Sequence, residues 1–150
     1  MVWTGISLGG HTDLHVLHRG NLTGVRHRDE ILDPYIRSYA GAIGKDFILM
    51  DDNVRPHRSV VAEVYLEGHG LGRMEWPAQS PDLNPVEHLW VYLGRKASAL
   101  SPPPRSLDEV KQRLLRVGPS LPFSVFGNLI DSMESRCRQC IQVRVGHIPN

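Results

Sequence analysis

The sequence has few cysteines, and this excludes a fold held together by disulfide bonds. Only Cys137 and Cys140 occur in 150 residues, too few for the disulfide framework of a small secreted domain. Their Cys-x-x-Cys spacing suits zinc, but no second cysteine pair completes such a site. The eight histidines form no HxH or HExxH pattern. We therefore expect both cysteines to be small, buried apolar groups on a helix.

Long apolar runs are absent as well. No stretch approaches the roughly 20 residues that a membrane-spanning helix needs, and no basic region followed by an apolar segment opens the chain. We expect a soluble intracellular protein without membrane contacts. Hydrophobic residues make up 41% of the sequence, which together with its length favours one globular domain with a real core.

Positive and negative charges nearly balance over the whole sequence, but they are unevenly distributed along it. Residues 1–90 contain 8 Lys and Arg against 12 Asp and Glu, whereas residues 91–150 contain 9 against 4, so that the two parts carry −4 and +5 and sum to +1. A basic C-terminal part is typical of contact with a phosphate backbone. It is also typical of ordinary solvated helix faces, and composition alone favours that alternative.

The order of apolar patterns predicts a mixed α/β fold. The expected strands cover residues 2–8, 13–18, 47–50 and 71–76, with residues 9–12 joining the first two as a hairpin. The expected helices cover residues 21–39, 57–67 and 85–99, one starting at Ser106 and one following Pro122. Pro34 should bend the first helix or delay its start. Four consecutive apolar residues at 47–50 predict a strand buried on both faces.

Two acidic residues stand where predicted elements begin and end. Asp52 follows the strand at 47–50, and Glu87 lies in the first turn of a helix with Asn84 as N-cap and Pro85 in first position. Both have structural explanations. Asp-Asp-Asn after a strand favours a turn, and a Glu three residues after an N-cap can bond back to it. The local sequence by itself favours these structural roles.

Longer motifs favour another interpretation of both acids. MDDNVRPHRS and WPAQSPDLNPVEHLW resemble the catalytic core of Tc/mariner-type transposases. MVWTGISLGG, GNLTGVRHRDEILDPYI and FGNLIDSMESRCRQCIQVRVGH are similar to that family's second strand, first helix and C-terminal helix, in the same order. The family places 34 residues between its second catalytic Asp and its Glu. Residues 53–86, which number 34, lie between Asp52 and Glu87, whereas 35 residues would separate Asp51 from Glu87.

The resemblance implies a ribonuclease-H-like mixed sheet flanked by helices, with an Asp, Asp, Glu triad that binds divalent metal and cleaves and transfers DNA strands in the nucleus. Asp52 and Glu87 would be the catalytic residues and would share Mg²⁺ or Mn²⁺, ions that prefer oxygen ligands. DNA at the transposon ends is the expected partner. Candidate phosphate contacts, with solvated surface residues as the alternative, are Arg55, His57, Arg58, Arg136, Arg138 and Arg144. We expect Trp76 and Trp90 to be core or loop anchors rather than base-stacking platforms.

The family's first Asp lies on a central strand upstream of the segment that MVWTGIS resembles, and its helix-turn-helix modules lie further upstream. Asp13, Asp29 and Asp51 are not convincing substitutes for that Asp. We therefore expect residues 1–150 to be a partial catalytic domain that is inactive alone, with its metal site weakened or lost. The absent strand should leave the strands at 2–8 and 47–50 without a shared neighbour and promote self-association. The alternative is a non-enzymatic remnant or co-opted module that binds nucleic acid or protein.

Overall fold

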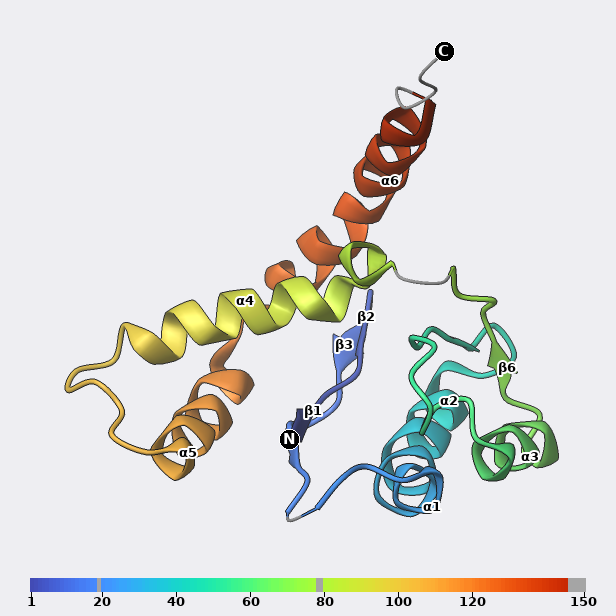
Figure 1. Cartoon of the computed structure of the whole chain (residues 1–150), viewed down its shortest axis with the longest axis horizontal. Coiled ribbons are helices and arrows are strands. Elements are labelled where there is room, and N and C mark those ends of the chain that lie inside the picture. The colour runs from blue at the N-terminus through green and yellow to red at the C-terminus, as the bar shows by residue number, and fades with distance from the viewer. Residues whose placement is uncertain (19, 78–79, 146–150) are drawn as a thin grey trace. The chain divides into compact units, whose positions relative to one another are not determined.

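The computed structural model describes residues 1–18, 20–77 and 80–145, with side chains up to residue 142. Its helices and strands are labelled in chain order in Figure 1. The residues group into two compact units, each described by itself. Unit 1 consists of Met1–Trp3 and His15–Ser80, and unit 2 of Thr4–Leu14 and Pro81–Asn150.

The N-terminal hairpin is made of short antiparallel strands. These are β1 (Val2–Trp3), β2 (Ile6–Ser7), β3 (Gly10–His11) and β4 (His15–Val16). β1 pairs with β4 and β2 pairs with β3. The expected connection at residues 9–12 is wrong, because Gly10 and His11 pair with β2 and the turn falls at residues 8–9.

An extra residue interrupts the strands of this hairpin. Two residues separate β1 from β2, whereas three separate β3 from β4, which is the pattern of a β-bulge. Thr12 donates its N–H to the Gly5 carbonyl at 2.9 Å, and its hydroxyl accepts from the Gly5 N–H at 2.9 Å. The Thr4 hydroxyl donates to the Thr12 carbonyl at 3.1 Å. Two of these three bonds use a threonine hydroxyl, and the continuous strand expected at residues 2–8 is divided into β1 and β2.

One continuous helical segment follows in unit 1. It comprises α1 (Gly24–His27), a π-helical stretch η1 (Arg28–Arg37) and α2 (Ser38–Ile43). Thr23 caps its start by accepting from the N–H of Arg26 at 3.2 Å. Pro34 does not delay the start of the helix, which begins at Gly24, and it lies within the π-helical stretch. The helix continues past the expected end at Tyr39 and stops at Gly44, whose φ of 85° suits glycine.

The remaining elements of unit 1 are β5 (Ile48–Leu49), α3 (Val60–Gly68) and β6 (Gly72–Arg73), with β5 and β6 parallel. α3 starts three residues later than expected, because Ser59 is its N-cap and residues 55–58 form a turn. The core contains Leu17, Ile31, Leu32, Ile36, Leu49, Ala62 and Leu66. Burial of each Leu or Ile contributes about 1.5–3 kcal/mol.

β5 is not buried on both faces, so that expectation is wrong. Leu49 is 9% exposed, but Ile48 is 60% exposed. Within the described part of unit 1, β5 pairs with β6 and β1 pairs with β4, and no strand pairing joins β1 to β5. The apolar side chain of Ile48 and one backbone edge of β5 are therefore without a strand partner in this part of the chain.

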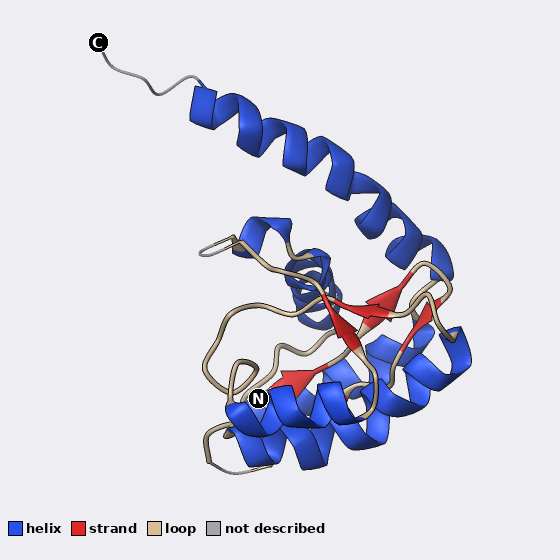
Figure 2. Ribbon diagram, turned by 90° about the vertical axis from the view of Figure 1, so that its right-hand side faces the viewer, coloured by secondary structure: helices blue, strands red, loops and turns tan. Residues whose placement is uncertain are grey.

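Unit 2 is mainly helical. Figure 2 shows the helices of the whole chain in blue and its short strands in red. Its helices are the short 3₁₀ segments η2 (Pro81–Leu83) and η3 (Gly118–Ser120), and α4 (Pro85–Ser98), α5 (Leu107–Val117) and α6 (Phe123–Val145). The expected caps are confirmed: Asn84 accepts from the N–H of Val86, and Ser106 accepts from the N–H of Glu109, both at 3.2 Å. The core contains Leu89, Leu93 and Phe126.

The C-terminal half of α6 extends beyond the other helices of unit 2 (Figure 1). Its Ile141 is 64% exposed. Cys140 is exposed and Cys137 is only partly buried, so the expectation that both thiols are buried is wrong. None of the helices in the described part of the chain has the length and hydrophobicity that crossing a bilayer requires.

We expect the isolated chain to self-associate through the open edge of β5, because exposed apolar edges favour pairing with another chain. An Ile48→Lys substitution should reduce the concentration-dependent increase in sedimentation coefficient. Val64→Lys is the matched control, since Val64 is 63% exposed but lies on α3. An equal effect of both substitutions, or a wild-type monomer at every concentration, would contradict this prediction.

Candidate functional site

Two neighbouring aspartates follow β5 in different environments. The Asp51 side chain is 10% exposed, and its Oδ2 lies 3.2 Å from Nη2 of Arg73. Burial raises the pKa of the Asp51 carboxyl, although the charge of Arg73 acts in the opposite direction. The side chain of Asp52 is 38% exposed. Asp51 is therefore committed to an internal ion pair, whereas Asp52 reaches solvent.

The Asp52 carboxylate is held through one of its two oxygens. Oδ1 lies 2.7 Å from Nδ1 of His57, and it accepts a hydrogen bond from the Val54 N–H at 3.3 Å. The bond to Val54 closes the turn that the local sequence favours. Among the described residues none donates to Oδ2, so this oxygen is open to a cation.

His57 packs against a second histidine that the sequence did not single out. His27 of α1 is 3% exposed, and its ring centroid lies 4.4 Å from that of His57. Burial, helped by the charges of His57 and Arg73, lowers the pKa of His27 to about 3. His27 is therefore neutral at physiological pH. A lone histidine in a helix carries no sequence signal of this role, because only the fold brings the two rings together.

Glu87 is exposed in the first turn of α4. Its structural alternative, a bond back to the helix cap, is not formed. The Asn84 N–H donates instead to the Pro81 carbonyl at 2.9 Å. No described residue pairs with the Glu87 carboxylate, which lies beside the positive end of the helix dipole.

Arg136 is engaged inside unit 2. Its Nη1 donates to the Asp82 carbonyl at 2.9 Å, and its Nη2 donates to the Leu129 carbonyl at 2.8 Å and to the Ser132 hydroxyl at 3.0 Å. His88 Nε2 also lies 3.1 Å from the Asp82 carbonyl oxygen. Arg136 therefore fastens α6 to η2, the segment that leads into the start of α4.

The other basic candidates differ in availability. Arg55 is exposed, whereas Arg58 is partly buried and its Nε has no hydrogen-bond partner among the described residues. Arg138 pairs with Glu134 at 2.6 Å, and their side chains are 72% and 75% exposed. Such an exposed pair adds little stability, so Arg138 can exchange Glu134 for a phosphate. The side chain of Arg144 lies outside the described residues.

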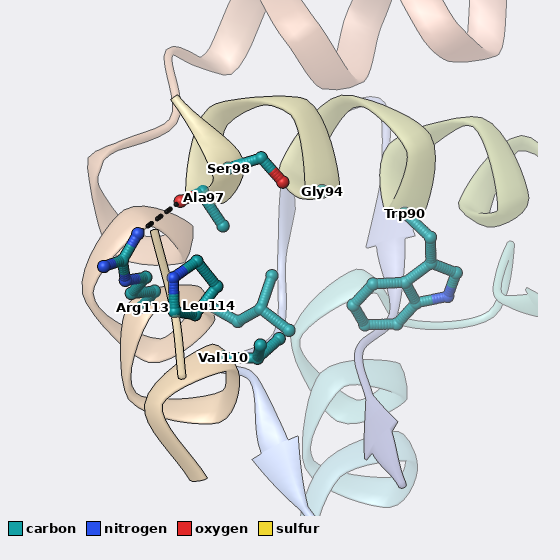
Figure 3. A pocket seen from close by; sticks show the side chains of 8 residues that line it. Trp90, Gly94, Ala97, Ser98, Val110, Arg113 and Leu114 are labelled. Atoms are coloured by element: carbon teal, nitrogen blue, oxygen red, sulfur yellow. Dashed lines mark hydrogen bonds between the residues drawn. The ribbon is translucent and has the colours of Figure 1, made fainter. Parts of the chain in front are cut away.

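A cavity of about 250 Å³ lies between α4 and α5 in unit 2 (Figure 3). Trp90, Val110 and Leu114 line it, and Arg113 at its edge donates to the Ala97 carbonyl at 3.2 Å. Its lining residues include no carboxylate, histidine or cysteine, so the cavity offers no metal ligand. Trp90 also packs against the core of unit 2, as expected of an anchor.

Trp76 lies in unit 1 and is partly buried. Its carbonyl accepts a hydrogen bond from Nδ2 of Asn53 at 2.9 Å. This bond links the segment after β6 to the turn that contains Asp52, as expected of a loop anchor.

The donor chemistry of both acids fits a hard cation. Asp52 and Glu87 each present a carboxylate oxygen without a partner among the described residues, and oxygen is the ligand that Mg²⁺ and Mn²⁺ prefer. Within the described ranges no three His, Cys, Asp or Glu side chains gather into one cluster. Asp52 belongs to unit 1 and Glu87 to unit 2, so their sharing of one ion stays a prediction.

Comparison with known proteins identifies the family. Residues 6–111 match the family model described as DDE superfamily endonuclease. The chain belongs to this family. The matched segment of this DDE endonuclease domain contains both Asp52 and Glu87, and the resemblance noted in its sequence is confirmed.

Relatives of this DDE domain are transposases of the Tc1 type. The chain is 30% identical over 117 residues to the transposable element Tcb2 transposase of Caenorhabditis briggsae. It is 34% identical over 99 residues to the transposable element Tc1 transposase of Caenorhabditis elegans. These alignments cover 77% and 66% of the chain but 42% and 36% of the two relatives. The chain thus spans less than half the length of the curated relatives it matches.

Solved structures support the expected fold class. The Mos1 transposase catalytic domain with raltegravir and Mg superposes with a TM-score of 0.77 at 19% identity, covering 95% of this chain and 72% of that one. The Mos1 mariner paired-end complex with Mn gives 0.77 at 19% identity, covering 99% and 44%. The DDE domain therefore has a ribonuclease-H-like mixed α/β fold. In its described part the strands pair two by two, and no pairing joins the strands near residues 2–8 to the strand at residues 48–49.

We expect His27 to make unit 1 sensitive to acid. Its pKa is about 3 in the folded chain against 6.5 ordinarily, so the unfolded chain binds the proton more readily between these values. The folded state therefore loses stability as pH falls from about 6.5 towards 3. A His27→Phe variant cannot take up this proton, and its free energy of unfolding in urea should fall less between neutral and mildly acidic pH. His69→Phe, at an exposed histidine, should keep the wild-type pH dependence, and an unchanged slope in His27→Phe would contradict the prediction.

Proposed function

We propose that this chain supplies metal-binding carboxylates to a transposase catalytic domain that cleaves and joins DNA strands, with Asp52 and Glu87 as ligands of Mg²⁺ or Mn²⁺. One observation carries the proposal. Both residues lie within the DDE endonuclease segment, and each has a carboxylate oxygen to which no residue in the described part of the chain donates. The proposal extends to action in the nucleus, where a DNA substrate of this kind is found.

A divalent ion bound here would activate the attacking hydroxyl and stabilise charge on the phosphate during an in-line displacement. The chain's own contribution is to hold the ligands. Asp52 offers Oδ2 while its Oδ1 contacts His57 and Val54, and Glu87 is presented by a capped helix end. Mos1 structures with Mg and with Mn, and a Mos1 paired-end complex with the left transposon end, support metal and DNA as partners.

We further propose that exposed arginines contact the DNA backbone without reading its sequence. Arg55 lies on the turn that follows Asp52, and Arg138 lies on the exposed half of α6. Guanidinium groups pair well with phosphate oxygens. Arg136 has a structural role instead, because all its described contacts are internal.

Metal binding can be tested by the loss of the free Mn²⁺ signal in electron paramagnetic resonance. Asp52→Asn and Glu87→Gln should each weaken Mn²⁺ binding more than about tenfold, since losing an outer partner of a ligand already costs about this much. If both bind one ion, the two single variants and the double variant should all weaken one and the same Mn²⁺ site, whereas ligands of separate ions would each affect a different site. Glu63→Gln, an exposed acid on α3, is the matched control. Wild-type binding by Asp52→Asn and Glu87→Gln would refute the assignment and favour a non-enzymatic module.

DNA binding can separate the roles of Arg136 and Arg138, which both lie on α6. Arg138→Ala should weaken binding to any duplex and lower the salt slope by about 0.9, because the variant neutralises one phosphate fewer, with no change in stability. Arg136→Ala should instead lower the free energy of unfolding by about 1–3 kcal/mol, because it removes the hydrogen bonds that Arg136 donates to the Asp82 and Leu129 carbonyls and to the Ser132 hydroxyl. Strong preference for one DNA sequence, or an unchanged salt slope in Arg138→Ala, would contradict the proposal.

A further inference from the structure

His57 is the side chain best placed to fix the orientation of Asp52. Its side chain is 15% exposed, and its Nδ1 lies 2.7 Å from Asp52 Oδ1. Nδ1 is buried and has no hydrogen-bond partner elsewhere among the described residues. A buried ring nitrogen needs a polar partner, and Asp52 Oδ1 is the group within reach.

We propose that His57 is a positioning residue for Asp52, which holds Oδ1 through Nδ1 and so leaves Oδ2 directed at a divalent cation. This inference rests on the proposed function, in which Asp52 is a metal ligand. Ordered outer partners of this kind set the direction of a ligating carboxylate and raise metal affinity.

The surroundings of His57 restrict its movement. The His27 ring packs against its imidazole with the centroids 4.4 Å apart. Its backbone N–H donates to the Val54 carbonyl at 3.0 Å, and its own carbonyl accepts from Arg73 Nη2 at 2.8 Å. Arg73 is fixed in turn by the buried carboxylate of Asp51. The backbone of His57 is therefore held at its N–H and at its carbonyl, and its imidazole packs against His27, before any ligand arrives.

The contact is a close approach rather than a fully aligned hydrogen bond, because the N–H of Nδ1 does not point straight at Oδ1. Hydrogen bonds of this kind are often misaligned in ligand-free sites and tighten when the ligand binds. The 2.7 Å distance to Asp52 Oδ1 identifies Nδ1 as the ring atom that contacts the carboxylate. The role of His57 can therefore be tested by changing the position of the donor nitrogen along the side chain at residue 57.

Two amide substitutions separate positioning from a merely structural role. The side-chain nitrogen of Asn corresponds to Nδ1 of histidine, whereas that of Gln reaches the position of Nε2. His57→Asn should therefore keep the donor that Asp52 needs, and His57→Gln should misplace it. His57→Ala removes the donor altogether, and His69→Ala is a matched control at an exposed histidine that contacts Tyr65.

The experiment measures Mn²⁺ affinity of the 150-residue chain by electron paramagnetic resonance, with urea unfolding of each variant. His57→Ala and His57→Gln should bind Mn²⁺ about 10–100-fold more weakly, and His57→Asn should recover most of the affinity. Fe²⁺ and ascorbate should cleave the backbone at residues 51–54 in the wild type and in His57→Asn.

The outcomes separate this inference from the proposed function. If Asp52→Asn abolishes binding but the three His57 variants bind like the wild type, the positioning role is wrong and the metal assignment stands. If His57→Asn and His57→Gln lose Mn²⁺ affinity equally, and in proportion to their loss of free energy of unfolding, His57 is merely structural and the inference is overturned. If Asp52→Asn leaves Mn²⁺ binding and cleavage unchanged, the proposed function itself fails.

Discussion

The buried ion pair between Asp51 and Arg73 determines the local structure of unit 1 after β5. Both side chains are about one-tenth exposed, and loss of either partner would leave an uncompensated charge in a poorly solvated place. The pair links the end of β5 to β6, and Arg73 also donates to the carbonyl of His57. With Asp51 committed to the interior, the next carboxylate, Asp52, is left at the surface. Because Asp51 is held in the ion pair, Asp52 is the carboxylate of this pair of aspartates that remains accessible to solvent.

Unit 2 uses the same physical device at a different place. Arg136 of α6 donates to the carbonyl of Asp82, just before the helix that carries Glu87. Arg113 likewise donates to carbonyls at the end of that helix. A guanidinium group offers five donors in a rigid plane, so one side chain can satisfy several backbone oxygens of an irregular segment. In each unit an arginine distant in sequence therefore holds the segment next to a candidate ligand.

The sequence predicts best where a local rule decides the outcome. The N-caps at Asn84 and Ser106 and the family itself follow from short-range chemistry and ordered motifs. The burial of Ile48 was mispredicted, because an apolar run does not reveal which neighbouring strands are present. The internal role of Arg136 could not be predicted either, since its acceptor Asp82 lies 54 residues earlier in the chain. Likewise, the pairing of Asp52 with His57 depends on a turn that the sequence pattern assigned to a helix.

The two units alternate along the chain, and this order affects when each unit can fold during synthesis. Every residue of unit 1 precedes residue 81, whereas unit 2 combines Thr4–Leu14 with residues from Pro81 onward. The β2–β3 hairpin must therefore wait for the helices whose apolar residues, Leu89 and Phe126 among them, cover Ile6. Contacts this distant in sequence form slowly and leave apolar surface open in the meantime. Synthesis that stalls near residue 80 would leave the residues of unit 1 together with a β2–β3 hairpin that lacks its covering helices. Because the two units alternate along residues 1–150, no single proteolytic cut within this range would separate one unit from the other.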